Sequence, residues 1–385
     1  MYPIVRKETL ADNIILMDIK APRVANECLP GQFVIVKTDE KGERIPLTIC
    51  DYDREKETVT IVVQTIGAGT ERMMALNEGD ALEDFVGPLG CPSELCEEEN
   101  LEETRKKKIV FIAGGLGTAP VYPQVKWLHE HGIDADVIMG SRTKDLLFYM
   151  DEMKAVAGNV YVCTDDGTYG FHGNGCQQLQ ALIDEGKHYD VCVAIGPMIM
   201  MKFVTILTKK LEIPTVVSMN PIMVDGTGMC GACRLTIGGK TKFVCIDGPE
   251  FDGALVDWDE MLKRMGTFKR AEKEEMEHYE QHLQTVKPDK HKESVNITMD
   301  VEPTSETLEQ LTNRNSQWRK DLRSSLKAKE RTEIPRVIMP ELDAEYRSHT
   351  RTEEVNRGLT KEMAIKEAHR CLDCVKPSCI EGCPV

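Results

Sequence analysis

The 385-residue sequence has no long hydrophobic run and no excess of basic residues. No stretch approaches the roughly 18 consecutive apolar residues that a membrane-spanning helix needs. The N-terminal residues 1–13 lack the apolar core of a signal peptide. Lys and Arg number 48 against 64 Asp and Glu, and the resulting net charge of −16 argues against nucleic acid or anionic membrane as a partner. These absences predict a cytoplasmic protein that binds neither nucleic acid nor membrane.

The 14 cysteines are unevenly distributed. Three fall within 230–245, four within 371–383, and seven are scattered. In a reducing compartment, cysteines in groups are more often metal ligands than disulfides. The scattered ones are predicted to be packed or free thiols. They are Cys28, Cys50, Cys91, Cys96, Cys163, Cys176 and Cys192.

A length of 385 residues predicts two or three domains. The predicted secondary structure also changes along the chain. Short β-branched runs near the N-terminus, such as Thr58-Val-Thr-Ile-Val-Val-Gln64, predict a small antiparallel barrel. From Ile109 onward, apolar strands alternate with helix-length segments, which predicts a parallel, doubly wound α/β sheet. Residues 97–108 are expected to form a solvated connector.

The predicted fold is therefore multi-domain. An antiparallel β-barrel is followed by a doubly wound α/β domain, a cysteine-bearing loop region, a helical segment with a linker, and a C-terminal iron–sulfur module. The predicted boundaries, in that order, are 1–100, 101–222, 223–250, 251–345 and 346–385.

The first cysteine group predicts a [2Fe–2S] site. Asp225-Gly-Thr-Gly-Met-Cys230-Gly-Ala-Cys233 is followed, after eleven residues, by Cys245. Iron–sulfur clusters need thiolates that converge on a small volume, and glycines let the backbone wrap around it. A Cys-x-x-Cys pair also fits zinc or a thioredoxin-like redox pair. Three cysteines leave a fourth ligand missing, and Asp225 is on chemistry alone equally a ligand or a turn residue.

Residues 1–280 resemble the electron-transfer subunit of class B dihydroorotate dehydrogenases, in which a barrel, a nucleotide domain and a cysteine loop follow in this order. The resemblance implies FAD on the barrel, NAD(H) on the doubly wound domain and a [2Fe–2S] cluster. That family is expected to use four cysteines, whereas this chain has Asp225 at the first position. An Asp followed by three Cys is similar to the small subunit of NADH-dependent ferredoxin:NADP oxidoreductase, the electron-bifurcating transhydrogenase. This second resemblance favours Asp225 as the fourth ligand.

The resemblance implies a flavin site on the barrel. Arg44-Ile-Pro-Leu-Thr-Ile49 resembles the motif in which an Arg pairs with the FAD pyrophosphate and a hydroxyl residue lies near the flavin ring. Arg44 stands one position further from Thr48 than is usual. The next strand and the turn Gly67-Ala-Gly-Thr70 would hold the pyrophosphate, although the turn alone carries little information. The implied residues are Arg44, Pro46, Leu47, Thr48, Val62, Val63, Gln64, Thr65, Gly67, Gly69 and Thr70.

A glycine-rich loop predicts the nucleotide site. Gly114-Gly-Leu-Gly-Thr-Ala-Pro120 follows a strand and opens a helix, where backbone N–H groups can face a pyrophosphate. A plain strand–helix turn is the alternative. Ser141-Arg142 would accommodate a 2′-phosphate, whereas the resemblance implies NAD(H), so the residues leave NAD against NADP open. The implied residues are Gly115, Gly117, Thr118, Ala119, Pro120, Ser141, Arg142, Asp166, Gly196, Pro197 and Met198.

The last cysteines form a ferredoxin-like run that predicts a [4Fe–4S] cluster in preference to zinc. The ligand candidates are Cys371, Cys374, Cys379 and Cys383. With the residues before it, this run resembles the N-terminus of the glutamate synthase small subunit, a module shared by the large subunit of the bifurcating enzyme. The chain is thus expected to fuse the small subunit to the opening of a truncated module, in which Cys383 lacks a complete cluster.

These inferences predict an electron-transfer flavoprotein. Hydride would pass between NAD(H) and FAD, and single electrons would pass through the [2Fe–2S] cluster to a glutamate synthase small subunit-like flavoprotein, and through it to ferredoxin. No catalytic acid or base is expected, because the cofactors carry the chemistry. The alternatives are an electron-transfer subunit of an NAD-dependent dihydroorotate dehydrogenase or sulfide dehydrogenase, and a zinc-stabilised scaffold without enzymatic activity.

Overall fold

The computed structural model describes residues 1–40, 42–285 and 320. The chain divides into one unit of residues 1–289 and another of residues 290–385. The expected linker from residue 286, the C-terminal module and its four cysteines therefore lie outside the described residues, apart from residue 320.

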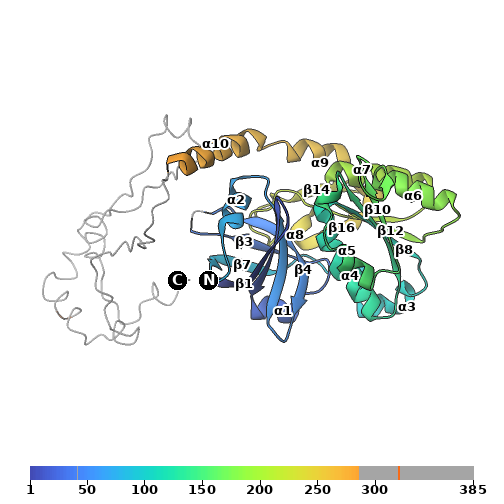
Figure 1. Cartoon of the computed structure of the whole chain (residues 1–385), viewed down its shortest axis with the longest axis horizontal. Coiled ribbons are helices and arrows are strands. Elements are labelled where there is room, and N and C mark those ends of the chain that lie inside the picture. Colours follow the sequence, from blue (N-terminus) through green and yellow to red (C-terminus); the bar gives the residue numbers. More distant parts are fainter. Residues whose placement is uncertain (41, 286–319, 321–385) are drawn as a thin grey trace. The chain divides into compact units, whose positions relative to one another are not determined.

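The first sheet is a seven-stranded antiparallel sheet that curls into a nearly closed barrel, as predicted (Figure 1). Its strand order is β6-β1-β2-β5-β4-β3-β7. Alternating side chains of the strands fill the barrel interior, and Ile15, Met17, Ile19, Ile61 and Val63 are fully buried there. The strands and helices are β1 (Tyr2–Ala11), β2 (Ile14–Lys20), α1 (Pro22–Glu27), β3 (Phe33–Lys37), β4 (Ile45–Asp53), β5 (Thr58–Gln64), α2 (Ala68–Ala75), β6 (Ala81–Leu82) and β7 (Asp84–Leu89).

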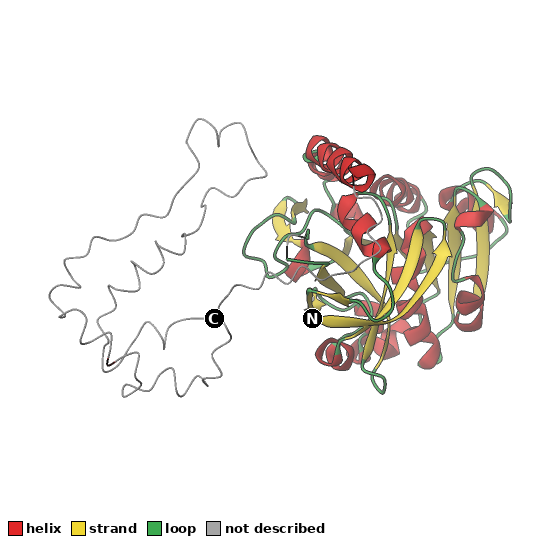
Figure 2. Ribbon diagram, turned by 60° about the vertical axis from the view of Figure 1, so that its left-hand side comes forward, coloured by secondary structure: helices red, strands yellow, loops and turns green. Residues whose placement is uncertain are grey.

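The second sheet has the order β11-β10-β9-β8-β12-β13-β16, and all its strands are parallel except β16. Figure 2 draws the strands of both sheets in yellow and the helices in red. Side chains of β8 alternate between two cores, with Val110 and Ile112 toward α6 and α7, and Phe111 and Ala113 toward α4. This two-sided burial confirms the doubly wound arrangement. The elements are β8 (Ile109–Gly114), α4 (Thr118–Glu130), β9 (Ala135–Ser141), α5 (Met150–Val156), β10 (Asn159–Thr164), β11 (Phe171–His172), α6 (Gly175–Asp184), β12 (Val191–Ile195), α7 (Met198–Lys210), β13 (Thr215–Ser218) and β16 (Glu250–Asp252).

Two expectations need correction. The stretch 97–108 is not merely a solvated connector, because it forms the short helical turns η2 (Glu98–Asn100) and α3 (Leu101–Thr104), with Thr104 buried. The helical segment does not begin at residue 251, because β16 first pairs with β13 and completes the second sheet. A three-residue strand carries too little periodicity to be recognised in sequence.

The cysteine region contains regular structure. Strands β14 (Arg234–Ile237) and β15 (Lys240–Phe243) form a hairpin around Gly238 and Gly239, both at positive φ as a two-residue turn requires. The short helix α8 (Val244–Asp247) follows, then α9 (Trp258–Met265) and α10 (Lys269–Thr285). The remaining turns are η1 (Glu94–Cys96), η3 (Gly115–Gly117), η4 (Lys144–Leu146) and η5 (Gly253–Leu255).

The C-terminal helix of the described residues returns to the barrel. Helix α10 lies beside α2 (Figure 1). Arg72 of α2 forms a 2.8 Å ion pair with Glu275 of α10, and its guanidinium lies over the Tyr279 ring. Within the described residues, no helix is both long enough and apolar enough to cross a membrane.

Candidate functional site

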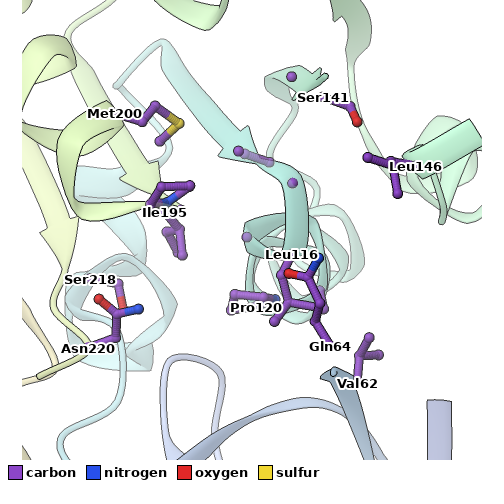
Figure 3. A pocket seen from close by; sticks show the side chains of 18 of the residues that line it. Val62, Gln64, Leu116, Pro120, Ser141, Leu146, Ile195, Met200, Ser218 and Asn220 are labelled. Atoms are coloured by element: carbon purple, nitrogen blue, oxygen red, sulfur yellow. The ribbon is translucent and has the colours of Figure 1, made fainter. Parts of the chain in front are cut away.

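A cavity of about 630 Å³ opens between the barrel and the edge of the parallel sheet. Its floor comes from loops that follow β8, β9, β12 and β13, at the carboxyl ends of the strands. The chain order reverses direction between β8 and β12, and such a switch point is where doubly wound sheets bind ligands. In Figure 3, Ser141 and Leu146 face Ile195, Met200, Ser218 and Asn220 across this space.

The glycine-rich loop after β8 is shaped by two close constraints. Gly115 has φ +54°, and the space where its Cβ would lie is open to the cavity. At Gly117 a Cβ would overlap the Ile195 carbonyl, so only glycine lets the loops after β8 and β12 touch. Pro120 lies in the first turn of α4, as predicted. The loop therefore offers backbone N–H groups beside a helix N-terminus, the usual cradle for a pyrophosphate.

One polar side chain at the end of β9 faces the cavity without a partner. The Ser141 hydroxyl is buried, lines the cavity and makes no hydrogen bond within the part of the chain that the structure describes. Arg142 and Asp165 line the cavity beside it. A buried hydroxyl is normally satisfied, so an orphan beside a cavity fits a polar ligand such as a ribose.

The barrel contributes the opposite wall. Pro46, Leu47 and Thr48 of β4 line it together with Val62 and Gln64 of β5, as the resemblance implies. Cys50 and Ile14 extend this wall with apolar surface. The site is therefore apolar on the barrel side and rich in glycine and polar groups on the sheet side, which suits an extended cofactor with a flat ring and a charged backbone.

Most of the expected residues do line this cavity: Pro46, Leu47, Thr48, Val62, Gln64, Gly115, Gly117, Ala119, Pro120, Ser141, Arg142, Gly196 and Pro197. The others do not. Val63, Thr118 and Met198 are buried beneath it, because side chains alternate along a strand or turn inward on a helix. Thr65, Gly67 and Gly69 lie outside its lining.

Two expected phosphate contacts are engaged elsewhere. The Thr70 hydroxyl accepts from the backbone N–H of Ile66 and Gly67 and donates to the Gly67 carbonyl, so it closes the turn that starts α2. Asp166 accepts from the Thr168 hydroxyl at 2.7 Å and is fixed in its turn, which lowers its pKa. Both side chains shape local backbone in this structure.

Arg44 is the clearest departure from the expected flavin contacts. Its Nε donates to the Val224 carbonyl at 2.6 Å, and a terminal nitrogen lies 3.5 Å from Asp84. The guanidinium therefore joins the residue just before β4 to the residue that directly precedes Asp225. In the sequence, Arg44 lies one position further from Thr48 than is usual in the flavin motif, and this unusual spacing accompanies the contact with Val224.

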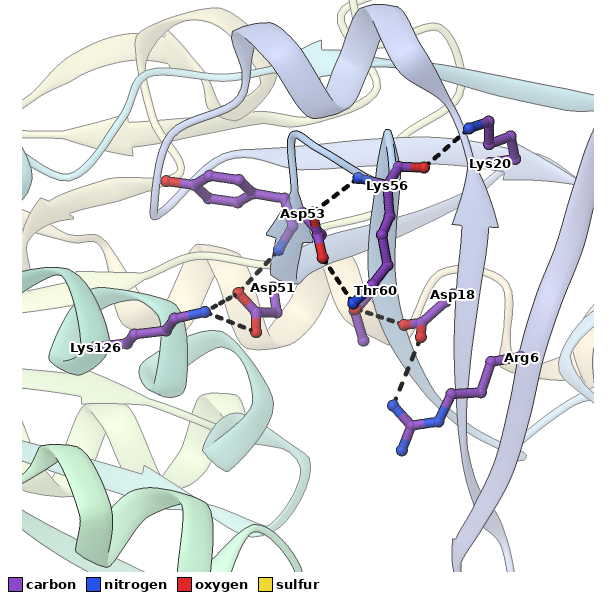
Figure 4. Close-up of polar contacts among 9 residues, drawn as sticks. Arg6, Asp18, Lys20, Asp51, Asp53, Lys56, Thr60 and Lys126 are labelled. Carbon is purple, nitrogen blue, oxygen red and sulfur yellow. Dashed lines mark hydrogen bonds and ion pairs between the residues drawn. The ribbon is translucent and has the colours of Figure 1, made fainter.

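An ion pair closes the far side of the barrel–sheet contact. Lys126 of α4 donates to both carboxylate oxygens of Asp51, at 2.8 and 3.0 Å (Figure 4). Both side chains are about 30% exposed, and the Lys126 ammonium also lies over the Tyr122 ring. Because Asp51 belongs to β4 of the barrel and Lys126 to α4, which packs on the second sheet, the pair links the two walls of the cavity.

The cysteine loop brings two of its predicted ligands together. The thiols of Cys233 and Cys245 are 3.3 Å apart and both residues are buried, whereas Cys230 is exposed. Gly226, Gly228 and Gly231 all have positive φ, so the backbone wraps as the glycine pattern predicts. The Asp225 carboxylate accepts from the Thr227 hydroxyl and lies 3.4 Å from the Cys230 backbone nitrogen.

The cysteine loop and α8 contain one thiol with a raised pKa and one carboxylate with a lowered pKa. Burial, together with the neighbouring Cys233 thiol, raises the pKa of Cys245 to about 12, because two thiolates this close would repel each other. The Thr227 hydroxyl lowers the pKa of Asp225, which is therefore an exposed anion. Within the described residues, no three His, Cys, Asp or Glu side chains gather around a single metal position. Three cysteine thiols in this region, with the Asp225 carboxylate close to Cys230, are donors of the kind that iron–sulfur sites use.

Some residues that line the cavity were not predicted from the sequence motifs. Ser218 and Asn220 come from the end of β13, and Asn174 caps α6 through a hydrogen bond from the Gln177 backbone. The general rule that ligands lie at the carboxyl ends of parallel strands would have identified the first two. Met200 reaches the cavity from the first turn of α7.

The fold and the site define a class of protein: the ferredoxin reductase-like oxidoreductases, which are flavoproteins that act on NAD(P)H, here with an iron–sulfur segment. A family model described as the iron-sulfur cluster binding domain of dihydroorotate dehydrogenase B matches residues 220–257. A Thermotoga maritima protein described as a dihydroorotate dehydrogenase B (NAD(+)) electron transfer subunit homolog is 44% identical over 270 residues, 70% of this chain and 92% of that protein. The chain belongs to the family of dihydroorotate dehydrogenase B electron-transfer subunits.

Other similarities extend this assignment. A Clostridium beijerinckii protein described as uncharacterized is 62% identical over 273 residues, 71% of this chain and 92% of that protein. A chain from the solved structure of an NADH-dependent reduced ferredoxin-NADP oxidoreductase is 40% identical, with a TM-score of 0.65, over 74% of this chain and 98% of that one. A second family model, described as dihydropyrimidine dehydrogenase domain II, 4Fe-4S cluster, matches residues 347–385, which include the four C-terminal cysteines.

Proposed function

We propose that this chain is the NAD(H)-linked subunit of a ferredoxin-dependent NAD(P) transhydrogenase. The observation that carries the proposal is the single cavity that joins a flavin-type barrel wall to a glycine-rich nucleotide loop, with a cysteine loop bonded to the same barrel. FAD, when bound, accepts hydride from NAD(H) and passes on single electrons. The chain's own residues place the two ring systems against each other and hold the nucleotide phosphates.

Specific groups would hold each cofactor. Thr48 and Pro46 of β4 would contact the flavin, and the Gly115–Gly117 loop would hold the NAD(H) pyrophosphate. The Ser141 hydroxyl suits a hydroxyl of an adenosine ribose, and the negative charge of Asp165 in the same lining would disfavour a 2′-phosphate. We therefore propose NAD(H) over NADP(H), although Arg142 lines the same region.

The cysteine loop would hold a [2Fe–2S] cluster through Asp225, Cys230, Cys233 and Cys245. Exposed apolar side chains surround it: Met229 is 88% exposed, and Val224 and Ile246 are each about half exposed. Large apolar groups exposed beside a redox site suit a partner flavoprotein that must come close for electron transfer. We propose a glutamate synthase small subunit-like flavoprotein as that partner, and a [4Fe–4S] cluster at Cys371, Cys374, Cys379 and Cys383 as part of the same module.

Anaerobic purification tests this proposal directly. We expect about one flavin per chain, acid-labile sulfide, a [2Fe–2S] electron paramagnetic resonance (EPR) signal after reduction, and flavin bleaching by NADH far faster than by NADPH. A colourless protein that binds zinc in place of iron would exclude the proposal.

A second function has a specific observation in its favour, namely the match of residues 220–257 to the cluster domain of dihydroorotate dehydrogenase B. In that case the partner would oxidise dihydroorotate. Addition of a dihydroorotate dehydrogenase catalytic subunit would then yield NAD-dependent orotate formation, whereas the favoured proposal predicts none and instead predicts ferredoxin reduction with the transhydrogenase partner.

A further inference from the structure

A carboxyl group that the proposed electron path does not use lies between the cavity and the cysteine loop. Glu250 begins β16, five positions after Cys245, and Gln124 of α4 donates from Nε2 to Glu250 Oε1 at 2.7 Å. Among the described residues, no Lys, Arg or His forms an ion pair with it. A carboxylate in such surroundings has no compensating positive charge.

Two buried polar side chains lie against Glu250. Ser93 is fully buried and Gln124 nearly so, and hydrogen bonding by both side chains favours the charged form of Glu250. The titratable groups that face Glu250 are Glu94 and Cys96 of η1, while β13 and α4 bring only Ser218 and Gln124. Burial of the carboxyl group, and to a smaller extent the neighbouring Glu94 carboxylate, outweigh the Ser93 and Gln124 hydrogen bonds and raise the pKa of Glu250.

The position of Glu250 connects it to both redox sites. It is the register partner of Ser218 on β13, so the two side chains lie on the same face of the sheet, about 5 Å apart at Cβ. Ser218 itself lines the cavity. On the other side, Gly248 accepts a 2.7 Å hydrogen bond from the Cys91 backbone and ends the helix that carries Cys245. Glu250 is therefore separated from the cofactor cavity by the Ser218 side chain. It follows closely in sequence the short helix α8, which contains Cys245.

We propose that Glu250 is a redox-linked proton site. When one electron enters the cofactor cavity, the Glu250 carboxylate binds one proton from solvent and becomes a carboxylic acid. When the electron leaves, the proton returns to solvent, so that net charge in the region stays constant. No bond forms between Glu250 and a cofactor. The proposal rests on the proposed function, because it requires an electron carrier in the cavity.

The test uses the full chain, loaded with its cofactors, and compares wild type with Glu250→Gln. Difference infrared spectroscopy between oxidised and dithionite-reduced protein should show a carboxylic acid C=O band that appears on reduction in wild type and is absent in Glu250→Gln. The matched control is Asp252→Asn, an exposed carboxylate on the same strand, which should keep the band. The midpoint potential of the electron carrier, monitored by EPR, should depend less steeply on pH in Glu250→Gln than in wild type. Asp252→Asn should keep the wild-type pH dependence.

A second variant covers the case in which Glu250→Gln does not fold. Glu94→Gln removes the neighbouring negative charge, so the pH at which the band appears should move lower. An unchanged band in Glu250→Gln, or an unchanged pH window in Glu94→Gln, would overturn the proposal. A chain that retains no flavin or iron would instead disprove the proposed function, so the two failures are distinguishable.

Discussion

Arg44 and Val224 are 180 positions apart in the sequence, yet Arg44 Nε donates to the Val224 carbonyl across 2.6 Å. Through this bond, the residue that precedes strand β4 of the barrel contacts the start of the loop that carries Asp225. The loop is also pressed onto the barrel at Gly226, where a Cβ would come within 2.7 Å of Ile35 and Leu89. The cysteine loop is thus built partly by the barrel.

This bond makes a prediction that separates two roles for Arg44. If it positions the cluster loop, Arg44→Ala should lower iron content and change the [2Fe–2S] EPR spectrum, cost about 1 kcal/mol of stability, and leave flavin content near normal. Arg44→Lys should restore part of the iron content. Flavin loss with a normal EPR spectrum would instead support the pyrophosphate contact expected from the sequence motif.

The glycine loop allows a matched pair of substitutions. Gly117→Ala places a Cβ against the Ile195 carbonyl, so we expect a loss of about 3 kcal/mol or more and of NADH binding. Gly115→Ala meets open space and suffers only from its positive φ, about 1 kcal/mol. Thermal unfolding and NADH titration measure both effects. Equal losses for the two variants would contradict the close approach of the two loops.

Asp225 is predicted to be the non-cysteine ligand of the cluster. Asp225→Cys should keep the iron and shift the g-values and the midpoint potential, since a thiolate donates more charge than a carboxylate. Thr227→Val is the control, because it removes only the hydroxyl that donates to Asp225. An EPR spectrum and a potential that stay the same in Asp225→Cys would exclude Asp225 as a ligand.

Solvent exposure predicts different rates of thiol alkylation in the metal-free chain. Cys230 is exposed, whereas Cys233 and Cys245 are each only 2% exposed. Cys230 should therefore react with iodoacetamide at least tenfold faster than the other two, and all three should be protected in the iron-loaded protein. Peptide mass spectrometry reads each site. Uniform reactivity in the metal-free chain would show that the loop depends on the cluster for its shape.

Glu250 also predicts how stability depends on pH. Its pKa is raised in the folded chain above the ordinary value of about 4.3, so the folded state binds more protons than the unfolded state between the two values. The free energy of unfolding should therefore fall as pH rises through this window. In Glu250→Gln that fall should be smaller, as measured by chemical denaturation of the metal-free chain at a series of pH values. A steeper fall in the variant would contradict the raised pKa.

Local sequence was enough to predict the two sheets, the glycine-rich loop after β8 and the wrapped backbone of the cysteine loop. Period-two runs such as β5 and buried apolar strands such as β12 carry their own signal, because side-chain periodicity reflects which faces are buried. The wrapped backbone of the cysteine loop was also predictable, because glycine is the residue that most readily adopts positive φ. Most of the cofactor-binding residues that the family resemblance implied line the cavity.

Only the tertiary structure decided which polar groups meet across long sequence separations. Arg44 with Val224, Lys126 with Asp51, and Gln124 with Glu250 all join elements whose pairing no local pattern encodes. The short strand β16 exists because β13 offers it a free edge, and it brings Glu250 behind the cavity wall. The sequence determined which segments carry the motifs typical of cofactor binding. The packing of the barrel against the second sheet decided which side chains meet, because these partners lie far apart in the sequence and come together only in the folded chain.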